Sequence, residues 1–124
     1  MLDYEIEAFG RRLGLDALAF SPEGVVRLDI ENIGSVYVEK SEQGASSEIL
    51  VYLAAPVPAH DEEAARRLLE LCDYRRGYAL PVFAGVFSGR AVLLTRMPEA
   101  SATAASLENA LRFLAELLHE TLRS

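Results

Sequence analysis

The stretch VVRLDIENIGSVYVE, residues 25–39, decides the fold. Apolar and polar residues alternate in both of its halves, first from Val26 to Ile30 and then from Val36 to Glu39. Strict alternation is typical of β-strands that have one face on a core and the other in water. Between the halves, Asn32-Ile33-Gly34 favours a tight turn. The stretch therefore predicts two antiparallel strands joined by a short connection.

The flanking segments extend this hairpin into a meander. Ser21-Pro22-Glu23-Gly24 has turn composition, so the sheet could begin before it, at Leu18 to Phe20. After the hairpin, the polar run from Ser41 to Ser47 predicts a flexible connection. Ile49 to Leu53 is apolar on both faces, which is expected of a central strand. Consecutive strands with short links predict antiparallel pairing.

Helices are expected at both ends of the chain. Large apolar residues recur at helical spacing near the N-terminus, and Gly14 follows them as a helix stop. These residues are Leu2, Ile6, Phe9 and Leu13. A leucine stripe predicts a second amphipathic helix from about Thr103 to Leu122.

Between the meander and the C-terminal helix, the sequence predicts one more helix and a hairpin. Asp61 is a plausible cap for a helix that runs to about Asp73. Tyr78 to Phe87 and Arg90 to Arg96 then form two strands across Ser88-Gly89. The predicted order is αβββαββα, an α+β fold with an antiparallel sheet flanked by helices.

Composition narrows the class of protein. With 124 residues, 51% of them hydrophobic, residues 1–124 are expected to form a single domain. The net charge of −7 argues against binding to nucleic acid or to an anionic membrane surface. No signal-peptide pattern and no apolar run of about 20 residues is found, so we expect a cytoplasmic protein.

No residue cluster predicts catalysis, a metal or another cofactor. His60 and His119 are the two histidines, and they stand in no metal-ligand spacing. Cys72 is the single cysteine, beside leucines on the expected helix, where it reads as a small buried hydrophobe. No glycine pattern matches a phosphate-binding loop. The sequence therefore favours a protein that binds another protein over an enzyme.

Several stretches together resemble the class I chaperones of bacterial type III secretion systems, the Tir chaperone-like family. They are Gly10 to Leu15 at the end of the first helix, Pro22 to Leu28, Leu68 to Cys72, Val92 to Pro98, and the long C-terminal helix. In one departure, Glu31-Asn32-Ile33-Gly34 replaces the aspartate-glycine turn that is frequent in the family.

The resemblance implies a bacterial cytoplasmic homodimer without a cofactor. It would bind the N-terminal chaperone-binding region of a secreted effector, keep it secretion-competent and aid its delivery to the secretion apparatus. In the family the first helix lines the client groove, and the second helix with the next strand forms the dimer contact. The expected effector-binding residues are Leu2, Ile6, Phe9 and Leu13, with Val26, Leu28, Ile30, Val36 and Val38 on the strands. The expected dimer interface comprises Leu68, Leu69, Cys72, Tyr78, Leu80 and Phe83.

Three alternatives remain open at the level of sequence. The chain could be an adaptor or scaffold of related fold outside secretion, a plain soluble domain whose apolar residues are all core, or a small enzyme. Gene neighbourhood distinguishes the first of these, because a secretion chaperone is usually encoded beside its effector.

Overall fold

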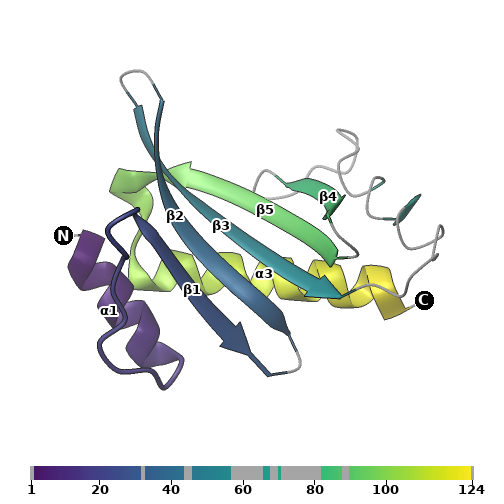
Figure 1. The fold of residues 1–124 in the computed structure, drawn as a ribbon, viewed down its shortest axis with the longest axis horizontal. Coiled ribbons are helices and arrows are strands. Elements are labelled where there is room, and N and C mark those ends of the chain that lie inside the picture. The colour runs from purple at the N-terminus through teal and green to yellow at the C-terminus, as the bar shows by residue number, and fades with distance from the viewer. Residues whose placement is uncertain are drawn as a thin grey trace.

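The computed structural model describes residues 2–31, 33–43, 46–56, 66–67, 70, 82–87 and 90–123. Its strands form one five-stranded antiparallel sheet in the order β1-β2-β3-β5-β4 (Figure 1). The elements are α1 (Leu2–Arg12), β1 (Val25–Ile30), β2 (Gly34–Gln43), β3 (Ser46–Pro56), β4 (Phe83–Phe87), β5 (Arg90–Pro98), the 3₁₀ helix η2 (Glu99–Ser101) and α3 (Ala104–Arg123).

The meander forms as predicted, with longer strands. Val26 lies opposite Val38 and Leu28 opposite Val36, so the apolar residues of both strands share one face. The flexible connection expected from Ser41 to Ser47 is wrong, because the β2–β3 ladder continues to the pair Gln43 and Ser46. Polar residues fit this ladder because the hairpin extends beyond the rest of the sheet (Figure 1).

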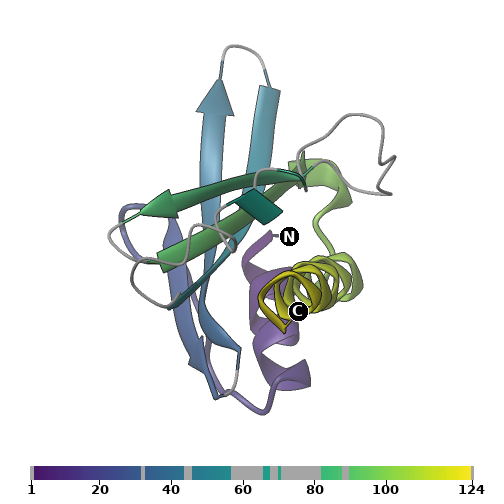
Figure 2. The same ribbon diagram turned by 90° about the vertical axis from the view of Figure 1, so that its right-hand side faces the viewer.

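Both helices lie on the same side of the sheet (Figure 2). We call this side the inner face and the opposite side the outer face. The core lies between the helices and the inner face. From the strands it includes Val26, Leu28, Val36, Val38, Ile49, Val51, Leu53, Ala91 and Leu93, and from the helices Ile6, Phe9, Leu107, Leu111, Leu114 and Leu118.

Glycine ends α1 as the sequence predicts. Gly14 has a φ of +81°, and its N–H donates to the carbonyl of Arg11 at 3.0 Å, while Leu15 N–H donates to that of Gly10 at 2.8 Å. This pair of hydrogen bonds is the Schellman motif, which satisfies carbonyls left over at a helix end. The motif turns the chain back along α1.

The strand proposed at Leu18 to Phe20 is wrong, because this segment has no ladder partner. It packs on α1 instead: a Cβ placed on Gly10 would lie 2.7 Å from the Cβ of Leu18. The Lys40 ammonium, from β2, lies 4.5 Å from the centre of the Phe20 ring. The segment therefore covers one end of the α1 helix and does not extend the sheet.

Side-chain caps fix where α3 begins. Thr103 N–H donates to Ser106 Oγ at 2.8 Å, and Ser106 N–H donates to Thr103 Oγ1 at 3.1 Å. This reciprocal pair corresponds to a capping box. From α1, the Glu5 carboxylate accepts a hydrogen bond from Ala104 N–H at 2.8 Å. A carboxylate at a helix N-terminus is also favoured by the helix dipole, so this contact stabilises α3 and holds it against α1.

The helix expected from Asp61 to Asp73 lies mostly outside the described residues, although 66, 67 and 70 are helical. The strand expected from Tyr78 begins at Phe83 in the described part. The final helix agrees with its prediction to within one residue at each end.

Candidate functional site

Six of the nine residues expected to contact an effector are core residues of this chain. Their exposed fractions are 5% or less, and Ile6, Phe9 and Val36 are at 0%. The other three are the strand residues Val26, Leu28 and Val38. The apolar face of the strands, on which we expected the effector to bind, is therefore covered, because both helices pack on it. Leu2, Leu13 and Ile30 are half-buried at the margin of the core.

The outer edge of β1 carries backbone groups that point away from the sheet. Lys40 N–H donates to the carbonyl of Gly24 at 2.9 Å, directly before β1 begins. In an antiparallel pair every second residue bonds to the partner strand, so residues 26, 28 and 30 face β2. The N–H and C=O groups of Val25, Arg27 and Asp29 consequently point outward.

The turn before β1 provides hydrogen-bond partners for the outward backbone groups of only one of these three residues, Val25. Val25 N–H donates to Ser21 Oγ at 3.3 Å, and Ser21 N–H donates to the Val25 carbonyl at 2.9 Å. Within the described part of the chain, no hydrogen bond to the outward backbone groups of Arg27 and Asp29 is found. These two residues leave an open segment of strand edge, which can pair with an added strand.

A polar network holds the second half of β1 in place. Ser35 Oγ donates to Asp29 Oδ1 at 2.8 Å. Arg90, from β5, donates from Nη2 to Ser35 Oγ at 3.0 Å and to the Ala54 carbonyl at 3.3 Å. Because this network joins β1, β2, β3 and β5, it stabilises the sheet next to the open edge.

A cleft of about 390 Å³ lies where α3 passes the end of α1 and the β1–β2 turn. Its lining comprises Leu13, Ile33, Glu108, Leu111, Arg112, Ala115, Glu116 and His119. Glu108 forms ion pairs with Arg12 at 3.0 Å and with Arg112 at 3.9 Å. The cleft could not be predicted from the sequence, because it is built from three segments far apart in the chain and no local pattern brings them together.

The outer face carries one row of side chains across all five strands. Cross-strand partners place Arg27, Tyr37, Tyr52, Leu94 and Phe83 side by side. The Tyr37 and Tyr52 rings stack with centroids 4.9 Å apart, and the Arg27 guanidinium lies 5.8 Å from the Tyr37 ring. Burial, together with the hydrogen bond that Tyr52 donates to Glu39 at 3.0 Å, raises the pKa of Tyr52 to about 12.

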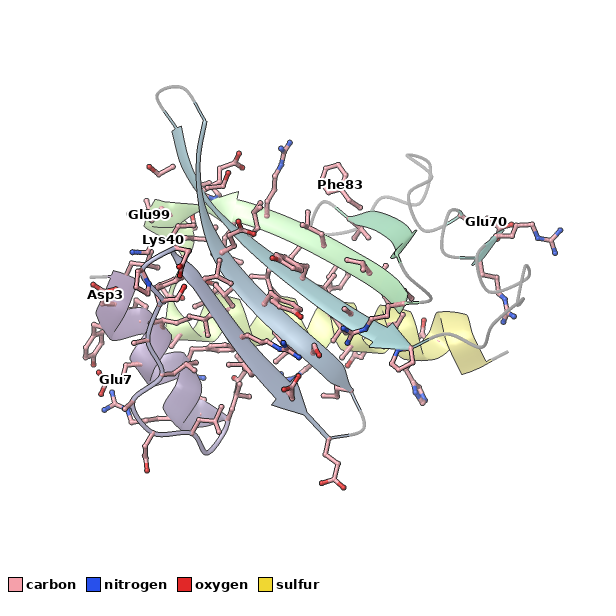
Figure 3. All side chains as sticks on the ribbon, viewed as in Figure 1. Asp3, Glu7, Lys40, Glu70, Phe83 and Glu99 are labelled. Carbon is pink, nitrogen blue, oxygen red and sulfur yellow. The ribbon has the colours of Figure 1, made fainter. Side chains whose placement is uncertain are left out.

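Phe83, at the β4 end of this row, is 46% exposed (Figure 3). The Arg96 guanidinium lies 5.4 Å from the centre of its ring. Phe83 is also the one residue of the expected dimer interface that the structure describes. Leu68, Leu69, Cys72, Tyr78 and Leu80 lie outside the described residues.

The described ranges contain neither a metal-binding cluster nor a membrane-spanning helix. No group of three or more His, Cys, Asp or Glu side chains there could hold a metal ion. No helix there is long and apolar enough to cross a membrane. His119 is exposed near the end of α3.

Three solved structures with the same fold are complexes of two proteins. SycH, a type III secretion chaperone of Yersinia pestis bound to a fragment of YscM2, superposes with a TM-score of 0.72 at 15% identity, covering 98% of this chain and 99% of that one. The HopA1–SchA chaperone–effector complex gives 0.72 at 16%, covering 98% and 92%. The ExsC–ExsE complex gives 0.74 at 17%, covering 98% and 91%.

At these identities the structural likeness concerns the fold. A search of curated protein sequences gives no significant match. Family membership comes from a sequence model that spans almost the whole chain. The model of the type III secretory system chaperone SycN matches residues 1–122, and the chain therefore belongs to this family of secretion chaperones.

Proposed function

We propose that this chain binds the N-terminal region of a secreted effector, keeps that region extended and secretion-competent, and aids its delivery to the secretion apparatus. The observation that carries the proposal is the open edge of β1 at Arg27 and Asp29. Solved complexes of the same fold with bound partners support it, as does the family to which the chain belongs.

An extended segment is the partner that such an edge fits. It can form main-chain hydrogen bonds with Arg27 and Asp29 as an added strand, which gives affinity with little dependence on sequence. Its alternate side chains can then cover half-buried apolar residues at the margin of the core, such as Leu13 and Ile30. The net charge of −7 helps to keep the chaperone soluble while this surface is empty.

The effector site that we propose therefore lies at the margin of the inner face, whereas the site expected from the sequence lay on the inner face itself. Filling the sealed inner face would require α1 or α3 to leave the core. Pairing with the β1 edge requires no such rearrangement. The predicted region of contact, around the first helix and the first strand, is retained, while the anchoring residues change.

We also propose that the protein acts as a homodimer through the β4 side of the sheet. Phe83 supports this because a large apolar side chain that is 46% exposed gains from being covered by a partner. Three half-buried side chains of the outer-face row lead up to it, namely Tyr37, Tyr52 and Leu94.

Co-expression with the secreted protein of the neighbouring gene tests the function. We expect the two proteins to co-purify, and the Arg27→Pro variant to lose most of the effector because proline removes the outward N–H. Proline is tolerated at strand edges whose N–H faces solvent. Arg27→Ala is the matched control: it removes the same side chain, keeps the N–H and should retain the effector.

Two results would contradict these proposals. If the wild-type protein fails to retain the effector, the proposed function is wrong. If the Arg27→Pro variant is folded by circular dichroism and retains the effector as well as the wild type does, binding does not use the β1 edge.

A further inference from the structure

The cleft beside the β1–β2 turn combines an apolar floor with a charged rim. Leu13, Ile33, Leu111 and Ala115 form the floor, and three of these four are only half-buried. Its volume of about 390 Å³ is ample for a large side chain, because a cavity of about 150 Å³ holds a benzene ring. The cleft therefore offers room for one apolar anchor.

The two carboxylates on the rim differ in whether they have an ion-pair partner. Glu108 is already paired with Arg12 and Arg112. Glu116 is exposed about two helical turns further along α3 than Glu108, and it forms no ion pair with any described residue. An additional group that binds at the rim would therefore be favoured if it were a cation close to Glu116.

The cleft continues from the open edge. Ile33 N–H donates to the Ile30 carbonyl at 3.1 Å, so this residue of the cleft floor belongs to the turn that ends β1. Antiparallel pairing is slightly more stable per residue than parallel pairing. An effector strand antiparallel to β1 begins beside Asp29 and Ile30, so the residues directly before it lie nearest the cleft.

We infer that the cleft binds the residues that precede the effector strand: a large apolar side chain on its floor and a neighbouring lysine or arginine paired with Glu116. This inference rests on the proposed function and names the sequence feature that the site selects. An extended segment with an apolar residue and a basic residue just before its alternating part is the chemistry that fits.

Synthetic peptides provide the probe. The test peptide carries Leu-Lys before an alternating Thr-Val stretch of about eight residues, a typical strand length. One control peptide has serine in place of the leucine and another has glutamate in place of the lysine. Fluorescence polarisation measures affinity, and the NMR signal of the His119 ring reports on the cleft, with His60→Gln used to assign it.

Loss of the leucine should weaken binding by about tenfold, as expected for an apolar side chain leaving a partly closed site. On the protein, Ala115→Leu should fill the cleft and weaken the test peptide, whereas Ala105→Leu, on the exposed side of α3, should not. Glu116→Lys should weaken the test peptide about threefold and strengthen the glutamate peptide, and Glu99→Lys, with the same net charge, should change neither.

Failure of this inference is separable from failure of the function. Suppose that the Arg27→Pro variant loses both peptide and effector, while Ala115→Leu and Glu116→Lys bind the test peptide as the wild type does. Binding at the β1 edge is then supported, and the inference about the cleft is wrong. If no peptide binds the wild type, the inference is also wrong, and retention of the effector decides the function by itself. Glu116→Lys keeps the test decisive if Ala115→Leu does not fold.

Discussion

Phe9 is the residue whose expected role changes most. It is one of the expected effector-binding residues and the only aromatic residue on the first apolar stripe, yet its side chain is 0% exposed. Phe9→Asp should therefore unfold the protein and not merely block binding. Burying an unpaired carboxylate while losing a phenylalanine from the core costs at least about 4 kcal/mol, a large part of a small domain's stability.

Urea denaturation followed by circular dichroism measures this effect. Tyr4→Asp is the matched control, since Tyr4 is on the same helix and is 64% exposed. A Phe9→Asp protein with the wild-type midpoint would show that Phe9 does not belong to the core in solution.

Tyr52 should make the free energy of unfolding depend on pH in the alkaline range. Burial and the hydrogen bond to Glu39 raise its pKa from 10.0 to about 12, so the folded state favours the neutral phenol. The resulting stabilisation is present below pH 10 and is lost as the pH rises through about 12, because the unfolded tyrosine ionises first. From about pH 9 to about pH 11 the wild type should lose more stability in urea than Tyr52→Phe does. An equal loss in both proteins would contradict this assignment.

At the scale of elements, local patterns predicted most of what the structure contains. Alternation located β1 and β2, and glycine located the end of α1, because both depend on the nearest few residues. Alternation says that one face of a strand is apolar, but not what covers it. Val26 and Val38 were therefore assigned to an effector when α1 and α3 cover them. The cleft was missed for the same reason, because it depends on how distant segments pack.

Gly10 sets how the segment after α1 packs. A Cβ at this position would lie 2.7 Å from the Leu18 Cβ, so Gly10→Ala should destabilise the protein even though alanine favours a helix by about 1 kcal/mol. Leu18→Gly removes the opposing atom, and in that background Gly10→Ala should be stabilising. Urea denaturation of the four proteins gives the coupling between the two sites. Stabilisation by Gly10→Ala in both backgrounds would mean that the segment does not pack tightly on α1.

The arrangement of the whole molecule separates two binding surfaces. The strand order places β1 and β4 at opposite edges of the sheet, and both helices close the inner face between them. An effector strand added to β1 and a second copy that covers Phe83 would therefore not compete for the same edge. The network around Ser35 and Arg90 ties four of the strands together, so occupation of one edge need not disturb the other.

The Phe83→Asp variant tests this separation of the two surfaces. In a two-fold interface each substitution occurs twice, so Phe83→Asp should convert the dimer to a monomer. The monomer should stay folded, because Phe83 is 46% exposed, and it should still bind the effector strand at β1. Light scattering measures the mass, with Tyr4→Asp as the control for an added exposed charge. A wild-type monomer at micromolar concentration would refute the dimer, and loss of the effector from a folded Phe83→Asp monomer would show that the two surfaces are coupled.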